Sequence, residues 1–162
     1  MTLRPATARD LGFIRAITAR PDMGAVLTDE TEAELALYLT DPESRLLIWE
    51  PQGRPAGFAL FCEIGHPTGR VELRRLALDR PGSGMGDAFL AALLAHAFAD
   101  LNAARLWFDV SGENLRAMRI YERAGCRREG IQRAHWWRPE LGRAVDLHLF
   151  GMMRDEWLAR QA

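Results

Sequence analysis

The sequence of 162 residues contains no lysine, so all 21 lysine-or-arginine positions are arginine. A lysine Schiff base is therefore excluded, and so is a Walker-type phosphate loop, because its lysine is part of the mechanism. Cysteine is scarce as well: Cys62 and Cys126 are too few for a disulfide framework or a zinc knuckle. This content fits a reducing compartment, and we expect no metal site.

The sequence also lacks an excess of positive or negative charge, and it lacks long apolar runs. The formal net charge is −1, so neither nucleic acid nor a membrane surface is favoured. No apolar run approaches the roughly 20 residues that span a bilayer, and the first residues lack a signal-peptide pattern. The composition is 48% hydrophobic and 27% charged, which is typical of a globular protein. We expect one cytoplasmic domain over residues 1–162 that binds neither nucleic acid nor membrane.

Hydrophobic periodicity and turn signals predict strands that alternate with helices. The expected strands are about 1–6, 45–50, 56–63, 70–78, 106–110, 127–138 and 143–154. The expected helices are about 7–19, 28–40, 86–101 and 114–124, with Thr7 and Thr28 as N-caps of the first two and Gly125 as a left-handed cap after the last. The order βααβββαβαββ predicts an α/β (α+β) protein, in which about four helices flank a mixed sheet of six to seven strands.

A glycine-rich loop, 79–86, joins one predicted strand to the next helix. Glycines let the backbone approach an anion closely, and the helix N-terminus offers unpaired amides and a partial positive charge. A phosphate or pyrophosphate is the natural occupant, although a plain tight turn has the same composition. A dinucleotide-binding Rossmann site is excluded, because the spacing is G-x-G-x-G and no strand-ending acid follows about 20 residues later.

Asn114 and Tyr121 lie on one predicted helix, seven residues apart. Seven residues are nearly two helical turns, so both side chains project from one face. Taken singly, Asn114 is also explained as an N-cap and Tyr121 as a core residue. Together, downstream of the glycine loop, they favour a shared functional role.

These two segments resemble the GCN5-related N-acetyltransferases, the GNAT family. The strand, glycine loop and helix resemble the family's motif A, and the pattern N-x-x-A-x-x-x-Y-x-x-x-G from residue 114 to 125 resembles its motif B. The tail REGIQR, followed by GRAVDLHLFGMMRDEW, is similar to the subgroup of ribosomal-protein alanine and polyamine acetyltransferases. The resemblance covers about residues 46–157.

Two positions depart from the family pattern. Pro81 stands where motif A has arginine or glutamine, which leaves the neighbouring Arg80 and the backbone amides as donors. Cys126 stands where the family has phenylalanine, and we expect it to pack as a small hydrophobic residue.

The resemblance implies the GNAT fold and direct transfer of an acetyl group from acetyl-CoA to an amine, with no metal. Pantetheine would pair with the edge of the long central strand, and pyrophosphate would rest on the loop amides. The implied cofactor-binding residues are Leu76, Ala77, Leu78, Gly82, Ser83, Gly84, Met85, Gly86 and Asn114.

Catalysis then needs a group that donates a proton to the leaving thiolate and one that removes a proton from the amine. Tyr121 is the predicted general acid, because a phenol stays protonated at neutral pH. Asp109 is the predicted base, and Glu72 or Glu63 on neighbouring strands are alternatives that would act through a water. Each carboxylate is also compatible with a surface role.

The acceptor is less determined. The resemblance assigns its cleft to the segment 20–34 and the last hairpin, where four acids (Asp29, Glu30, Glu32, Glu34) would favour a cationic amine or only complement a helix N-terminus. His135, Trp136 and Trp137 would form an apolar wall. The stripe of Arg116, Arg119 and Arg123 would approach the ribose 3′-phosphate of CoA or only be solvated.

The predicted partners are therefore a small-molecule or peptide amine, such as a protein N-terminus or a polyamine, and a second copy in a homodimer. An alternative remains, in which the same fold is a catalytically weak acyl-CoA sensor or a protein-interaction module.

Overall fold

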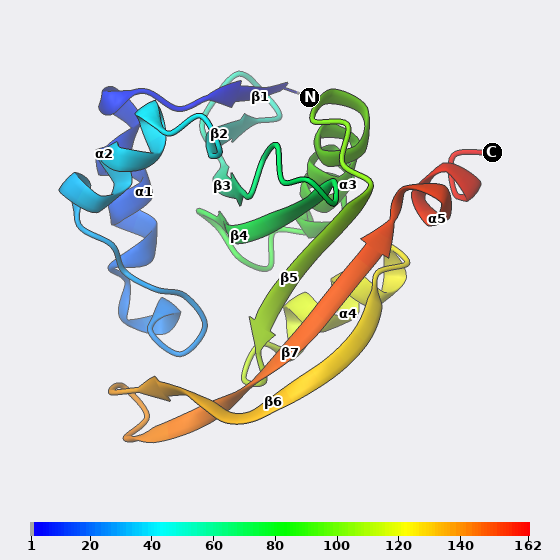
Figure 1. Ribbon diagram of the computed structural model, residues 1–162. Coiled ribbons are helices and arrows are strands. Elements are labelled where there is room, and N and C mark those ends of the chain that lie inside the picture. Colours follow the sequence, from blue (N-terminus) through cyan, green and yellow to red (C-terminus); the bar gives the residue numbers. More distant parts are fainter. Residues whose placement is uncertain (1) are drawn as a thin grey trace.

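The computed structural model describes residues 2–162, which form a seven-stranded mixed sheet with helices on both faces (Figure 1). The sheet order is β1-β2-β3-β4-β5-β7-β6. Its strands are β1 (Thr2–Pro5), β2 (Arg45–Glu50), β3 (Gly57–Cys62), β4 (Arg70–Leu78), β5 (Arg105–Ser111), β6 (Arg127–Arg138) and β7 (Arg143–Met153). The helices are α1 (Leu11–Thr18), α2 (Glu32–Thr40), α3 (Gly86–Ala95), α4 (Leu115–Arg123) and α5 (Arg154–Ala159). The seven strands and their order along the chain confirm the fold predicted from the sequence.

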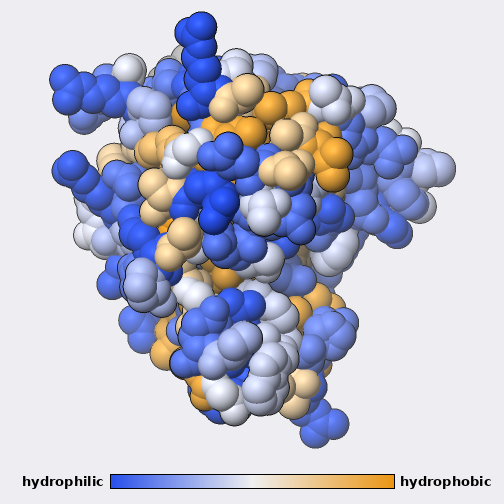
Figure 2. All heavy atoms as spheres, turned by 90° about the vertical axis from the view of Figure 1, so that its left-hand side faces the viewer, coloured by the Kyte–Doolittle hydropathy of each residue, from blue (hydrophilic) through white to orange (hydrophobic). Residues whose placement is uncertain are grey.

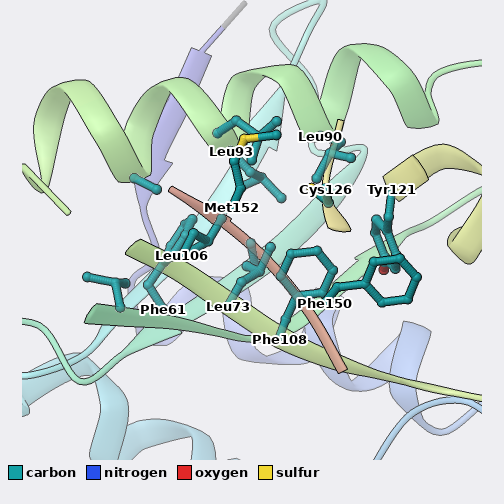
Figure 3. Close-up of a cluster of buried hydrophobic side chains, with 14 of the residues drawn as sticks. Phe61, Leu73, Leu90, Leu93, Leu106, Phe108, Tyr121, Cys126, Phe150 and Met152 are labelled. Carbon is teal, nitrogen blue, oxygen red and sulfur yellow. The ribbon is translucent and has the colours of Figure 1, made fainter. Parts of the chain in front are cut away.

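Two hydrophobic layers hold the helices to the sheet. On one face, the side chains of Ile14 and Ile17 from α1 pack against alternate residues of β2 and β3, because successive strand residues point to opposite faces. On the other face, α3 and α4 cover a larger aromatic core whose members Phe108 and Phe150 stack at 5.9 Å between ring centroids (Figure 3). The sheet is thus buried on both faces over its first half.

The second helix starts three residues later than predicted, with Thr31 rather than Thr28 as its N-cap. The Thr31 hydroxyl accepts the Glu34 backbone N–H at 3.2 Å, and the Glu34 carboxylate accepts the Thr31 backbone N–H at 2.7 Å. This reciprocal capping box requires an acid or amide three residues after the cap. Thr28 has Thr31 at that position, so the prediction of a Thr28 cap is wrong.

The short helix α5 was not predicted from the sequence, and the expected last strand ran one residue into it. Its first turn begins where the Glu156 carboxylate accepts the Met153 backbone N–H at 2.9 Å. The ring of Trp157 then stacks on Phe98, with 5.5 Å between ring centroids. At six residues the helix is too short for a periodic pattern to reveal it.

The pairing of β4 with β5 positions the functional site. The two strands are parallel, and they are in register only from Arg70 to Glu72 of β4. Beyond Glu72 the two strands separate, while β4 stays paired with β3 as far as Leu78. The separation opens the sheet at its centre (Figure 1). Within residues 2–162, no helix has both the length and the apolar character that a membrane span requires.

Candidate functional site

The glycine-rich loop lines a cavity of about 720 Å³ beside the gap between β4 and β5. Gly82 and Gly84 have φ angles of +84° and +80°, the left-handed region that side chains disfavour. A methyl group built on Gly84 would meet nothing within 4 Å, since this residue faces the cavity. Gly86 also lines the cavity, whereas Met85 packs against the hydrophobic core. Ser83 is exposed and is not among the lining residues.

The free edge of β4 forms the inner wall of this larger cavity. Leu76, Ala77 and Leu78 line it, and none of them is in register with β5. Backbone groups on such an edge can pair with an added extended chain. An extended ligand with an anionic end therefore fits the cavity, with its chain along β4 and its anion on the loop amides.

Tyr121 lies where the larger cavity ends in the core. The side chain is 5% exposed, and its ring meets Phe108 edge-on at 4.7 Å and Phe150 at 5.5 Å between ring centroids. Figure 3 shows Tyr121 at one margin of the core, next to Cys126. Burial raises the pKa of the Tyr121 phenol, so the group is protonated at neutral pH and can act only as a proton donor. Burial likewise raises the pKa of Cys126 to about 12, which fits the predicted packing role.

Asn114 is the N-cap of α4 and also lies in the walls of both cavities. Its side-chain oxygen accepts the backbone N–H of Ala117 at 3.2 Å, so it is the N-cap of α4. It also lines the larger cavity and a second, smaller cavity next to it. The cap thus fixes the start of α4, and the helix then places Tyr121 two turns further along.

The second cavity, of about 210 Å³, is also lined by Tyr121, and Asp109 lies in its wall. Among the described residues, Asp109 makes no hydrogen bond or ion pair. Loss of hydration, followed by repulsion from Glu72, raises the pKa of the Asp109 carboxyl, although Arg75 and His135 act in the opposite direction. Asp109 is an exposed residue of β5, and a carboxylate with a raised pKa and no partner is a better proton acceptor than one held in an ion pair.

The two alternative carboxylates are already engaged. Glu72 accepts from the Arg74 guanidinium at 2.6 Å, and it is absent from the lining of both cavities. Glu63 accepts from Arg70 at 2.7 Å and from the Trp107 indole N–H at 2.7 Å, and these bonds lower the pKa of its carboxyl. The geometry therefore favours Asp109 over Glu72 and Glu63 as the base.

The outer wall of the smaller cavity comes from the β6–β7 hairpin. Trp136 lines the cavity, whereas Trp137 is 60% exposed on the opposite face of β6. The Arg138 guanidinium stacks on Trp136 at 3.9 Å from the ring centroid and donates to the Leu27 carbonyl at 3.4 Å. This contact ties the hairpin to the loop after α1. Sequence analysis missed Arg138, because its partner lies 111 residues away and no local pattern marks the pair.

Three of the four acids assigned to the acceptor cleft have partners within the protein. The Asp29 carboxylate accepts from the Thr18 hydroxyl at 2.8 Å, and Glu30 accepts from the Tyr38 hydroxyl at 2.8 Å. Glu34 belongs to the capping box. Glu32 alone has no partner in the described part of the chain. The face that carries α1 and α2 is mainly hydrophilic, with scattered apolar patches (Figure 2).

Comparison with known proteins agrees with this geometry. A family model described as an acetyltransferase (GNAT) domain matches residues 1–127. An uncharacterised N-acetyltransferase of Mycobacterium tuberculosis (strain H37Rv) is 36% identical over 104 residues, which are 63% of this chain and 65% of that protein. The spermidine N(1)-acetyltransferase of Escherichia coli (strain K12) is 29% identical over 137 residues, 79% of this chain and 73% of that protein.

The fold itself has close structural neighbours. A crystal structure of the spermidine N-acetyltransferase of Vibrio cholerae, in complex with CoA and spermine, superposes with a TM-score of 0.83. It covers 97% of each chain at 22% sequence identity, so the likeness concerns the fold. The described residues contain no group of three or more histidine, cysteine, aspartate or glutamate side chains that could hold a metal ion.

Proposed function

The chain belongs to the GNAT acetyltransferase family, and we propose that it transfers the acetyl group of acetyl-CoA directly to a primary amine. One observation carries the proposal: the two cavities meet, and both are lined by Leu76, Asn114 and Tyr121. An acyl donor in the larger cavity and an amine in the smaller one would converge at the Tyr121 side chain.

The larger cavity supplies the donor site. In the proposed complex, amides of the glycine loop bind the pyrophosphate and the free edge of β4 pairs with pantetheine. Gly84, whose missing side chain leaves the loop open, supports this assignment. Acetyl-CoA brings the activated acyl group, and backbone N–H groups at Leu76–Leu78 would polarise its carbonyl.

The smaller cavity supplies the acceptor site and the proton acceptor. Asp109 takes a proton from the ammonium group, which leaves a neutral amine able to attack the thioester carbonyl. The C–N bond forms as the C–S bond breaks, Tyr121 donates its proton to the departing thiolate, and the new amide nitrogen releases its second excess proton to solvent. The buried phenol can then regain a proton from solvent once product leaves. No step needs a metal.

The acceptor is proposed to be a compact amine. The cavity of about 210 Å³ accommodates an amine and a few neighbouring atoms. The E. coli relative acetylates spermidine according to its name, which supports polyamines as the first acceptors to try. Cytoplasmic location and a homodimer remain predictions.

Release of the CoA thiol tests the proposal directly. Purified protein is incubated with acetyl-CoA and a panel of spermidine, an aminoglycoside and a peptide with a free N-terminus, and mass spectrometry then identifies the product. N-acetylated forms of the same compounds are the matched controls. We expect turnover with at least one free amine and none with its blocked form. Binding of acetyl-CoA without turnover of any amine would instead favour a sensor, and the absence of both would contradict the proposed function.

A further inference from the structure

Helix α4 presents three arginines to the larger cavity: Arg116, Arg119 and Arg123. Arg123 is engaged, since its guanidinium donates to both carboxylate oxygens of Asp87 at 2.9 Å. Asp87 lies in the first turn of α3, where its charge would otherwise repel an anion on the loop. Arg123 therefore neutralises the negative charge of Asp87 beside the loop. Arg116 and Arg119, in contrast, have no hydrogen bond or ion pair within residues 2–162.

Arg116 lies directly on the glycine loop. A methyl group built on Gly82 would be only 2.9 Å from Nη1 of Arg116, and one on Gly86 would be 2.6 Å from Cδ1 of Ile120. The helix thus runs along the loop, with Arg116 at the Gly82 end and Ile120 one turn later. A glycine at position 82 thus has two effects: it allows the positive φ of the turn, and it leaves space for the Arg116 guanidinium group.

The loop itself offers few other donors at this end. Pro81 lacks a backbone N–H. Arg80 is 86% exposed and faces Asp79 at 3.9 Å, and it is absent from the cavity lining. An anion at the start of the loop would thus meet Arg116 as its nearest unpaired cation. A guanidinium fork suits phosphate oxygens, because it can donate two parallel hydrogen bonds.

We propose that Arg116 binds the pyrophosphate of acetyl-CoA and supplies, from α4, the cationic donor that the loop lacks at Pro81. This inference rests on the proposed use of acetyl-CoA. It distinguishes Arg116 from the other two arginines: Arg123 pairs with Asp87, and Arg119 lines the cavity but is not among the atoms nearest to Gly82, Gly84 or Gly86.

Calorimetric titration with CoA and with dephospho-CoA tests the assignment, because both ligands carry the pyrophosphate and only CoA carries the 3′-phosphate. We expect Arg116→Ala to weaken binding of both ligands by about tenfold, as for loss of one charge-assisted hydrogen bond at an exposed site. Arg116→Lys, which keeps the charge without the fork, should recover part of the loss. Arg54→Ala removes an exposed arginine from the β2–β3 turn and is the matched control, with no expected change.

Each other outcome contradicts the assignment in a specific way. A loss confined to CoA would mean that Arg116 binds the 3′-phosphate. A loss for Arg119→Ala but not for Arg116→Ala would transfer the role to Arg119. Equal affinities of Arg116→Ala and the wild type, in proteins with the same Tm, would overturn the proposal while leaving the proposed function intact. Failure of the wild type to bind CoA would contradict the proposed function itself.

Discussion

The two cavities that meet at Tyr121 are built in opposite ways. The larger one is formed mainly by two continuous segments, one from the end of β4 through the glycine loop into α3 and the other running into α4, and the loop after α1 completes it. The smaller one draws on the loop after α1, on β4 and β5, and on the β6–β7 hairpin. Long continuous segments thus supply most of the first cavity, whereas the second is assembled from short pieces of several elements.

Their charges differ as well. Arg116 and Arg119 are unpaired in the larger cavity, so that side is ready for an anion. In the smaller cavity the arginines are engaged, Arg74 with Glu72 at 2.6 Å and Arg75 with Glu30 at 3.7 Å. Asp109 is the charged residue of the smaller cavity that has no partner among the described residues. Under the proposed function, the donor side would bind phosphate through these arginines, and the acceptor side would rely on the single carboxylate of Asp109.

The largest expected effect tests the backbone character of the donor side. Gly84→Val should weaken CoA binding by about 100-fold or more, because it fills the open space above the loop and strains a left-handed residue at a cost of roughly 1–3 kcal/mol. Calorimetry measures the affinity. Gly53→Val is the matched control, since Gly53 has φ +70° and an equally open α-carbon but lies in the β2–β3 turn. Unchanged affinity in a folded Gly84→Val protein would contradict the assignment of the loop.

The next effect concerns the junction between the cavities. Tyr121→Phe keeps the packing on Phe108 and Phe150, and its hydroxyl makes no hydrogen bond with a described residue, so Tm should change little. We expect kcat to fall by about 100-fold, the low end for general-acid catalysis, because a thiolate is a fair leaving group. Affinity for CoA should persist. Wild-type kcat with a chemistry-limited acceptor would reduce Tyr121 to a core residue.

The same contrast explains which features the sequence could reveal. The glycine loop, the cap at Asn114 and the spacing to Tyr121 are local patterns, and the structure brings them together as predicted. The order of the strands along the chain could also be predicted, because each strand is a short apolar run between turn residues. The prediction of Thr28 as the N-cap was wrong because Thr28 and Thr31 are both candidates, and only Thr31 has an acid three residues later.

The acceptor side could not be read in the same way. Arg138 and its partner Leu27 are joined only by folding. The bulge around Ala134, where φ is +47°, determines which tryptophan faces the cavity, and no residue pattern announces it. The match to the family model ends at residue 127, before this hairpin. Long-range contacts thus shape the part of the site that we propose to bind the acceptor.

A smaller effect is expected at Asp109. Asp109→Asn should lower kcat/KM by about tenfold at pH 7, with less effect at high pH, where solvent deprotonates the amine. In the wild type, the acid limb of the activity profile should lie above the usual carboxyl range, because the pKa of Asp109 is raised. A pH–rate profile of both proteins measures these effects. An unchanged acid limb in Asp109→Asn would exclude Asp109 as the base.

The same variant has a predicted effect on stability. A folded-state pKa above the unfolded value means that the folded protein binds the proton more tightly, so stability falls as pH rises through the folded pKa. Asp109→Asn removes this loss, and its Tm should exceed that of the wild type at pH 7. The difference should shrink toward pH 3, below the usual aspartate pKa of about 3.9, where both states are mostly protonated. Thermal denaturation at the two pH values measures the effect, and a lower Tm for Asp109→Asn at pH 7 would contradict it.

The smallest effects separate structural acids from acids that attract the acceptor. Thr31→Ala removes the cap of α2 without changing any charge, so it should cost about 1 kcal/mol of stability and leave KM unchanged. Glu32→Gln removes the acid without a partner, and it should leave Tm unchanged. If the acceptor is cationic, its KM should rise by at most about twofold in Glu32→Gln, and added salt should erase the difference, because exposed charges are screened over about 8–10 Å. A KM that responds to Thr31→Ala but not to Glu32→Gln would show that this segment shapes the cleft through its fold and not through its charge.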